Sequence, residues 1–326
     1  MRDMVLRGLH LFPLSSQGTL PKTLPAPGEG AEGLDLILFC SSGELGVMQQ
    51  QDIAAWSRQQ AFCQLSPRRA FVSLACASWY AALLEFERSP CRHAEIWVIE
   101  SPASFIQERL DCAGLGHGGA GLTVQPGIAR MVLQKCQAKH GELVLEACAL
   151  FAKPAGLRGT EQLIKRYGAW LAAGLGDDHA AGWVSFAIAT GWSDQLLAGL
   201  SHWFPQLMER LTRLPSMETD TVHLLAIKPL HELHREIAQR HSGTLFITTL
   251  AAGGRIGCVV VRTAERALPG AVQRDKPHAV PVPAGSMLPG MPPDYCDPQY
   301  RYVDNQYFLT EMTLCSQCSR TWNDYE

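Results

Sequence analysis

The chain has 326 residues, of which 47% are hydrophobic and 18% are charged, and its formal net charge is -3. These values are typical of a globular protein with a sizeable core, built as one large domain or as two fused halves. The 28 lysines and arginines are scattered, so nothing in the sequence indicates binding to nucleic acid or to a membrane surface. No apolar run is long enough to span a bilayer, and the first residues lack the apolar segment of a signal peptide. We therefore expect a cytoplasmic protein.

The first third of the chain alternates short apolar runs with helical patterns. We predict strands at residues 34–40, 70–75 and 95–99 and helices at 47–62 and 77–88, after a loop over 11–33. Strands that alternate with helices in this way indicate right-handed crossovers and a parallel sheet. The second of these strands runs directly into Cys76, and the helix begins immediately after it.

The rest of the chain is less regular. We predict helices at residues 159–175, 193–213 and 229–241, strands at 182–189 and 221–227, and a hairpin made of 244–249 and 258–261. Beyond Ala264, prolines become frequent and mark a linker. The final residues are polar and rich in tyrosine, which leaves open either a docked tail or a mobile one.

The 11 cysteines do not indicate a disulfide scaffold, because such scaffolds are small and cysteine-dense and because the number is odd. Most of them stand singly among apolar residues. We predict that the following six are small buried hydrophobic residues: Cys40, Cys63, Cys112, Cys136, Cys148 and Cys258.

Residues 34–38 (LDLIL), 73–83 (SLACASWYAAL) and 114–122 (GLGHGGAGL) form an ordered set of three segments. Together they resemble the ketosynthase III-like branch of the thiolase superfamily, the 3-oxoacyl-ACP synthase III-like proteins. Residues 34–38 (LDLIL) are similar to the early buried strand of that family. Residues 73–83 (SLACASWYAAL) resemble its strand–Cys–helix element, and 114–122 (GLGHGGAGL) its glycine-rich segment. Residues 250–257 (LAAGGRIG) match its C-terminal glycine loop more weakly. The order and spacing of these segments carry the resemblance.

The resemblance implies an α/β, thiolase-like fold. In such a fold, two similar βαβ-type halves form a layered α/β/α/β/α arrangement, here followed by a C-terminal extension. We expect the first half, with Cys76, to cover residues 1–150 and the second half to cover 151–264. Residues 265–326 then form a Pro-rich linker and an aromatic tail.

The resemblance also implies that Cys76 is a nucleophile that carries an acyl group. A thiol at the start of a helix faces unpaired backbone N–H groups and the positive end of the helix dipole, which favour the thiolate. The thiolate can attack a thioester and hold its acyl group. The family implies an oxyanion hole made by the backbone N–H groups of Cys76 and Gly253, and one such donor contributes about 3 kcal/mol. The alternative is that Cys76 is one more buried cysteine at the end of a strand.

Condensing members of the family pair this cysteine with a histidine and an asparagine, and here both are missing from the matching loops. Residues 187–195 (AIATGWSDQ) contain no histidine, and residues 214–243 contain no asparagine. His223 is the nearest candidate for a base. Decarboxylative condensation is therefore not supported by the sequence, whereas acyl transfer with a single base remains chemically feasible.

Two functions follow from the resemblance. The first is an acyltransferase without a cofactor that takes acyl groups from an acyl carrier protein or a coenzyme A thioester, in fatty-acid-like or specialised-metabolite biosynthesis. The second is a non-catalytic subunit that pairs with an active ketosynthase. The chain is expected to form a homodimer in the first case and a heterodimer in the second. The G-x-S-x-G elbow of an α/β hydrolase is absent from the sequence.

The remaining motifs are weak. Residues 116–121 fit the G-x-G-x-x-G pattern of dinucleotide binding, but a strand pattern follows where a helix is needed, so we expect these glycines to allow close packing. His231 and His234 have a spacing that suits zinc, but no third ligand is evident, so we expect a solvated helix face.

The tail contains a C-x-x-C pair, Cys315 and Cys318, with Cys296 upstream. The only candidate for a fourth zinc ligand is His278, which lies across a Pro-rich stretch. A zinc site and a redox pair both remain open, but we expect an ordinary tail and no bound metal.

Overall fold

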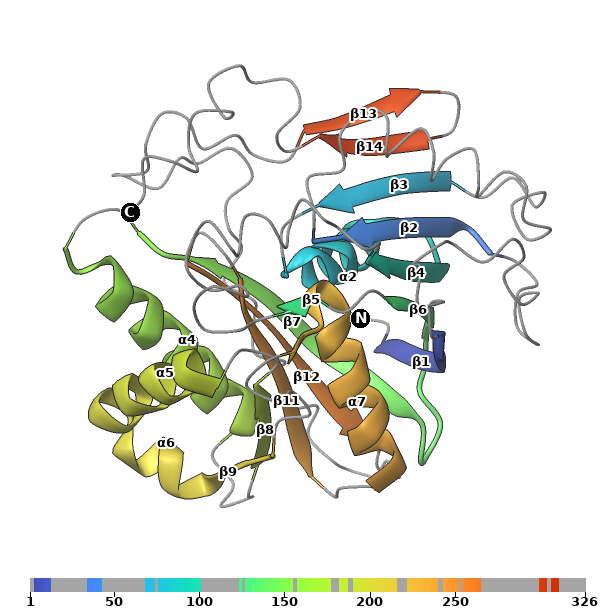
Figure 1. Cartoon of the computed structure of the whole chain (residues 1–326). Coiled ribbons are helices and arrows are strands. Elements are labelled where there is room, and N and C mark those ends of the chain that lie inside the picture. The colour runs from blue at the N-terminus through green and yellow to red at the C-terminus, as the bar shows by residue number, and fades with distance from the viewer. Residues whose placement is uncertain are drawn as a thin grey trace.

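The protein is seen here in a computed structural model, and its described part consists mainly of strands and helices (Figure 1). The described residues are 3–12, 34–42, 68–73, 76–100, 123–124, 127–154, 157–176, 182–186, 190–215, 222–239, 243–251, 254–264, 299–303 and 306–310. The strands are β1 Asp3–Phe12, β2 Leu36–Ser41, β3 Arg68–Ser73, β4 His93–Glu100, β5 Thr123–Val124, β6 Gly127–Cys136, β7 Leu143–Ala152, β8 Gly182–Phe186, β9 Leu211–Arg213, β10 Val222–His223, β11 Thr244–Ala251, β12 Arg255–Thr263, β13 Gln299–Val303 and β14 Gln306–Thr310. The helices are α2 Ser78–Arg88, α4 Gly159–Leu175, α5 Thr190–Trp203, α6 Pro205–Arg210, the 3-10 helix η2 Leu225–Ile227, and α7 Lys228–Gln239.

One large sheet with a repeated strand order organises these elements. Its order is β13-β14-β3-β2-β4-β6-β1-β7-β12-β11-β8-β9. Strands β1, β2, β3, β4 and β6 are the first to fifth sheet strands of the first half, and β7, β8, β9, β11 and β12 are those of the second. Counted inward from β3 and from β9, both halves have the same order: third, second, fourth, fifth and first. In both halves the fifth strand, β6 or β12, runs antiparallel to its neighbours. The first strands, β1 and β7, pair antiparallel where the halves meet. The chain thus contains two similar βαβ-type halves, while their predicted boundary at residue 150 stays a prediction.

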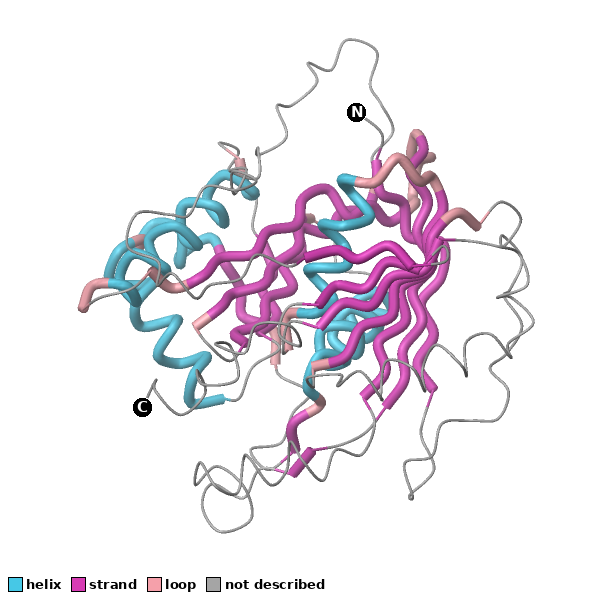
Figure 2. The backbone as a smooth tube through the Cα atoms, turned by 90° about the horizontal axis from the view of Figure 1, so that it is seen from above, coloured by secondary structure: helices cyan, strands magenta, loops and turns pink. Residues whose placement is uncertain are grey.

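Helices and strands alternate in layers. Helix α2 lies between the halves, in contact with β2, β3 and β4 of the first and with β7 and β12 of the second. Helix α7 packs on β11 and β1, and so also joins the two halves. Helices α4, α5 and α6 lie together at one side of the molecule, and α4 covers the other face of β7 and β11 (Figures 1 and 2). This layering agrees with the predicted α/β class.

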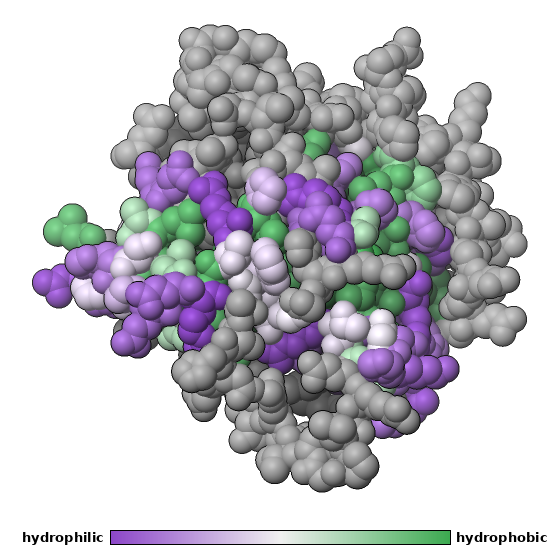
Figure 3. All heavy atoms as spheres, turned by 90° about the horizontal axis from the view of Figure 1, so that it is seen from below, coloured by the Kyte–Doolittle hydropathy of each residue, from purple (hydrophilic) through white to green (hydrophobic). Residues whose placement is uncertain are grey.

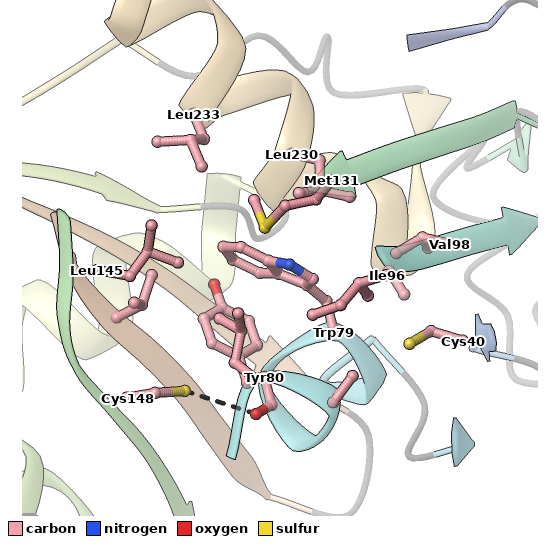
Figure 4. Packing of buried hydrophobic residues seen from close by; sticks show 14 of the residues in the cluster. Cys40, Trp79, Tyr80, Ile96, Val98, Met131, Leu145, Cys148, Leu230 and Leu233 are labelled. Atoms are coloured by element: carbon pink, nitrogen blue, oxygen red, sulfur yellow. Dashed lines mark hydrogen bonds between the residues drawn. The ribbon is translucent and has the colours of Figure 1, made fainter. Parts of the chain in front are cut away.

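Helix α2 is the centre of the larger apolar cluster. Its absence of Pro and Gly and its helical spacing of apolar residues place Trp79, Tyr80, Leu83 and Phe86 inside, each with 0% exposure. The Trp79 and Tyr80 rings pack 4.8 Å apart, between side chains from α7, β4, β6 and β7 (Figure 4). The tight packing fixes the position of the whole helix.

Most of the predicted elements are confirmed. The strands around residues 36–41, 68–73 and 93–100, the helix after Cys76, and the hairpin of β11 and β12 lie where we predicted them. The single helix over 193–213 is wrong: Pro205 starts a new helix, α6, and residues 211–213 form strand β9. The predicted strand over 221–227 is also wrong, because only Val222–His223 is extended. Strands β1, β6 and β7 were not predicted, and the predicted helix over 47–62 lies outside the described residues.

Part of the tail is docked onto the sheet. Strands β13 and β14 form an antiparallel hairpin, and β14 pairs in parallel with β3. Of the two alternatives for the tail, docking is therefore confirmed for residues 299–303 and 306–310. Cys296, Cys315, Cys318 and His278 lie outside the described residues.

The described surface is mixed in character. Hydrophilic side chains cover much of the described face seen from below (Figure 3). Trp203 is 41% exposed, and the Lys165 ammonium lies 3.5 Å from its ring centroid, which covers part of the ring. No described helix has the length and apolar character needed to cross a membrane.

Candidate functional site

Cys76 lies at the point where the third strand of the first half gives way to the buried helix. It is 9% exposed and stands two residues before α2 begins. Ala77 is the N-cap of α2, and no side chain caps the helix there. The positive end of the helix dipole therefore acts at Cys76 without a capping side chain between them.

The carboxyl ends of three parallel strands meet beside Cys76. Strands β2, β3 and β4 pair in parallel, and ligands of open α/β sheets bind beyond this edge. Ser78 donates its hydroxyl to the Ser41 carbonyl oxygen at 2.7 Å, which ties the start of α2 to the end of β2. The Ser42 backbone N–H and hydroxyl donate to the two Glu100 carboxylate oxygens at 2.8 and 2.7 Å. The carboxyl ends of β2 and β4 and the start of α2 are thus joined by hydrogen bonds.

The second half reaches the same edge through the segment before α7. Helix η2 contacts α2 and β4, and the Ala226 N–H donates to Glu100 Oε1 at 3.3 Å. His223 directly precedes this segment in β10, which pairs in parallel with β5. The structure therefore brings the backbone of His223 to the end of the molecule where Cys76 lies. The side chain of His223 is not among those described, so its role as a base stays a prediction.

Gly253, the second predicted oxyanion donor, lies outside the described residues. Its described neighbours are Ala251 and Gly254, the last residue of β11 and a turn residue with φ 68°. Ala251 is 3% exposed and belongs to the same apolar cluster as Cys76. The oxyanion role of Gly253 and of the Cys76 N–H stays a prediction.

Glu100 was missed by sequence reasoning. It is the last residue of β4, it is 1% exposed, and its carboxylate accepts hydrogen bonds from Ser42 and Ala226. Burial, together with the negative charge of Glu100, raises the pKa of the Cys40 thiol well above its usual range. The available signal was a single acidic residue at the carboxyl end of an otherwise apolar strand.

The other thiols provide a reference for Cys76. Cys91 follows the opposite end of α2 and is 8% exposed, so the two cysteine residues have nearly the same overall exposure. Burial is confirmed for Cys40, Cys148 and Cys258, and it raises the pKa of each thiol. The prediction that Cys136 is buried is wrong. Cys136 is only partly buried, and its sulfur accepts a hydrogen bond from Arg7 at 3.2 Å. Cys63 and Cys112 lie outside the described residues.

The histidines of α7 differ from the predicted solvated face. His231 is partly buried, and desolvation together with the neighbouring His234 lowers its pKa. His234 is exposed. Within the described ranges no three His, Cys, Asp or Glu side chains are grouped so that they could hold a metal ion. The glycine-rich segment 116–121 is not among the described residues.

Comparison with known proteins identifies the fold. No protein-family model matches the sequence, and no curated protein matches it. Among solved structures, the acyltransferase ChlB3 is 14% identical at a TM-score of 0.55, over 81% of this chain and 99% of that one. A variant of OleA from Xanthomonas campestris is 11% identical at a TM-score of 0.53, over 80% and 98% of the two chains. The FabH 3-oxoacyl-(acyl carrier protein) synthase III of Pseudomonas aeruginosa is 14% identical at a TM-score of 0.48, over 82% and 100%. The matches to ChlB3 and OleA show that the chain has the predicted thiolase-like fold, in a divergent form.

Proposed function

From the thiolase-like fold and the place of Cys76 in it, we propose that this chain is an acyltransferase. Cys76 takes an acyl group from an acyl carrier protein or a coenzyme A thioester and passes it to a nucleophilic acceptor, in fatty-acid-like or specialised-metabolite biosynthesis. The observation that carries the proposal is the position of Cys76 between β3 and the buried helix α2, which has no side-chain cap and contacts η2 of the second half.

The chemistry needs few groups. The Cys76 thiolate attacks the thioester carbonyl carbon, and a new C–S bond forms while the oxygen becomes an oxyanion. The backbone N–H groups of Cys76 and Gly253 would hold that oxyanion. When the intermediate collapses, the bond to the carrier sulfur breaks and the carrier leaves as a thiolate. The acceptor then attacks the carbonyl carbon of the acyl-Cys76 thioester, the acyl C–S bond breaks and the Cys76 thiolate leaves. His223 is the residue proposed to take the acceptor's proton.

Intact-mass measurement tests the first step. The protein is incubated with acyl-CoA and acyl carrier protein thioesters of several chain lengths, and the mass gain of one acyl group is recorded. We expect an adduct with the parent protein and with Cys91→Ala, and none with Cys76→Ala. An adduct that survives in Cys76→Ala, or no adduct with any chain length, contradicts the proposal.

The environment of Cys76 can be tested without a substrate. Cys76 and Cys91 lie at opposite ends of α2 and have nearly equal exposure, 9% and 8%. The dipole at the start of a helix contributes about 0.3–1 kcal/mol, so we expect iodoacetamide to alkylate Cys76 about two to five times faster than Cys91. Peptide mass spectrometry measures the alkylation rate of each cysteine. Equal rates for Cys76 and Cys91 would show that the dipole does not activate Cys76.

A second function is favoured by the missing histidine of residues 187–195 and the missing asparagine of 214–243. In that case the chain is a non-catalytic subunit and its partner is an active ketosynthase. It would then form a stable heterodimer and show no Cys76 adduct on its own. Native mass spectrometry of the chain alone and of the chain with the ketosynthase separates these outcomes. A homodimer that acylates alone supports the acyltransferase. A cytoplasmic location is part of both proposals.

A further inference from the structure

The two halves allow the surroundings of Cys76 to be compared with their counterparts in the repeat. Cys76 stands two residues before α2, and in the second half Ala226 stands two residues before α7. Helix α2 leads into the fourth strand β4, which ends at Glu100, and α7 leads into the fourth strand β11, which ends at Ala251. In the repeat, Ala226 therefore corresponds to Cys76, and Ala251 corresponds to Glu100.

Helix α2 and the segment before α7 each contact the fourth strand of the opposite half. The segment before α7 contacts β4, and there the Ala226 N–H donates to the Glu100 carboxylate. Helix α2 contacts β11 through Tyr80, whose hydroxyl lies 3.1 Å from Thr249 Oγ1 and 3.3 Å from the Ile247 carbonyl oxygen. Cys76 and Ala251 lie in one apolar cluster. The contacts around the two helix starts are therefore arranged in the same crossed way.

The difference between the halves lies in the side chain at the end of the fourth strand. At Ala226, a carboxylate oxygen of Glu100 lies 3.3 Å from the Ala226 backbone nitrogen. At the matching place in front of Cys76, the strand ends in the methyl side chain of Ala251 and a glycine turn follows. The acyl oxygen of the proposed thioester would take the place there that Glu100 Oε1 takes in front of Ala226.

We propose that Glu100 is a positioning residue of the Cys76 site, an inference that rests on the proposed acyl transfer. Its carboxylate binds the Ala226 N–H, the counterpart in the second half of the Cys76 N–H that is proposed to hold the oxyanion. This hydrogen bond fixes the segment before α7 against the end of β4. Since His223 lies only three residues before Ala226 in the sequence, Glu100 also sets the position of His223 relative to Cys76. Glu100 acts through these neighbours and does not contact the acyl group.

The contacts of Glu100 suit this task. Its two oxygens accept from the Ser42 N–H, the Ser42 hydroxyl and the Ala226 N–H, so one side chain joins the end of β2, the end of β4 and the start of η2. Glu100 is 1% exposed and its hydrogen bond with Ala226 is buried, so that bond is little weakened by competition with solvent. A carboxylate at the start of a helical segment is also favoured by the helix dipole. Loss of the carboxylate leaves buried backbone N–H groups without this acceptor, so the segment before α7 becomes the easiest part of the site to move.

Amide hydrogen exchange tests whether Glu100 holds this segment. Glu100→Met is similar in size and removes both acceptors, while Glu100→Gln keeps one acceptor oxygen and serves if the methionine variant does not fold. We expect exchange at Ala226 to rise roughly tenfold or more in Glu100→Met relative to the central strand β11, and less in Glu100→Gln. Glu95→Gln is the matched control, because Glu95 is the other buried carboxylate of β4 but pairs with Arg130. If Glu100→Met raises exchange uniformly, or if Glu95→Gln raises it at Ala226 as much, the inference is wrong.

Acylation and alkylation of Cys76 together test the functional part. A small alkylating reagent needs only the thiolate, whereas acyl transfer needs the aligned groups of both halves. We expect Glu100→Met to lower the rate of Cys76 acylation roughly tenfold or more and to leave its alkylation by iodoacetamide close to that of the parent protein. Equal loss of both rates, or of neither, overturns the positioning role. Failure of the parent protein to acylate refutes the proposed function instead, and the exchange experiment then still decides whether Glu100 fixes the start of α7.

Discussion

Replacement of Gly257 by alanine should destabilise the protein, because β12 approaches α2 closely at this glycine. A Cβ atom at Gly257 would lie 2.4 Å from Tyr80 Cδ2 and 2.9 Å from Cε2. Normal carbon contacts are about 3.5–4 Å, so the ring must move by roughly 1 Å. Tyr80 is fully buried and its hydroxyl is held by Thr249 and Ile247, so the ring has little freedom to move.

The expected loss follows from three contributions. Overpacking of a filled core costs about 1–3 kcal/mol, and a disturbed Tyr80 hydrogen bond costs about 1 kcal/mol. Alanine in a strand recovers about 0.5–1 kcal/mol of backbone entropy relative to glycine. We therefore expect Gly257→Ala to lower the free energy of unfolding by about 1–3 kcal/mol, measured by urea titration with linear extrapolation.

Gly8→Ala is the matched control for Gly257→Ala. Its added Cβ would lie 3.2 Å from His10 Nε2, the end of an exposed side chain that can move away. We expect a change within about 0.5 kcal/mol. In a double-mutant cycle, Tyr80→Leu should absorb the cost of Gly257→Ala, with a coupling of about 1 kcal/mol or more. A Gly257→Ala protein as stable as its parent, or independent effects of the two substitutions, would refute the argument that the Tyr80 ring fixes α2 and with it Cys76.

Three further predictions concern buried charges and protons. Arg130→Met leaves the buried Glu95 carboxylate without its ion pair and should cost about 3–5 kcal/mol in urea unfolding, whereas replacement of both residues by apolar ones should cost less. Burial raises the pKa of the Cys148 and Cys258 thiols, so the unfolded chain loses these protons at a lower pH than the folded protein does. Their contribution to the free energy of unfolding should be fully present below about pH 8.5 and should fall as the pH rises above it. The variant with alanine at both positions should show a shallower fall. The pKa of His231 is lowered, so its contribution to the free energy of unfolding is complete above about pH 6.5 and falls as the unfolded chain takes up a proton at lower pH. His231→Gln should remove that part of the acid dependence. An unchanged dependence of stability on pH in this variant would contradict the prediction.

Local sequence patterns predicted the elements that surround Cys76. Helix α2 has no Pro or Gly and carries its apolar residues at helical spacing, so its limits were predicted within a residue. Strand β2 is buried at all six positions and appears as one apolar run. The thiolase-like resemblance rested on these same segments, which is why the fold could be predicted from so few motifs.

The missed elements have physical reasons. Strand β1 carries a register shift between Leu6 and Gly8, which breaks the apolar alternation that predicts a strand. Strand β6 includes Arg130, which looks solvent-exposed in the sequence but is buried against Glu95 of the neighbouring strand. The prediction of one helix over 193–213 overlooked Pro205, which cannot continue the preceding helix.

The candidate site was predicted only in part. The place of Cys76 follows from a strand and a helix that are adjacent in the sequence. Glu100 could not be predicted, because its role depends on Ser42 and Ala226, which are brought to it by the sheet and by the pairing of the two halves. Contacts of this kind are set by topology, which a single sequence shows only through its resemblance to known folds.

The pairing of β14 with β3 also affects the order in which the chain can fold. Residues 306–308 pair with residues 69–71, so β3 receives its second neighbour only after almost the whole of this sequence has left the ribosome. Until then, the backbone N–H and C=O groups on that side of β3 form an open edge that can pair with another chain. The strand that leads into Cys76 is thus completed late in synthesis, and a slow translation rate or a shortened tail should favour aggregation through this edge.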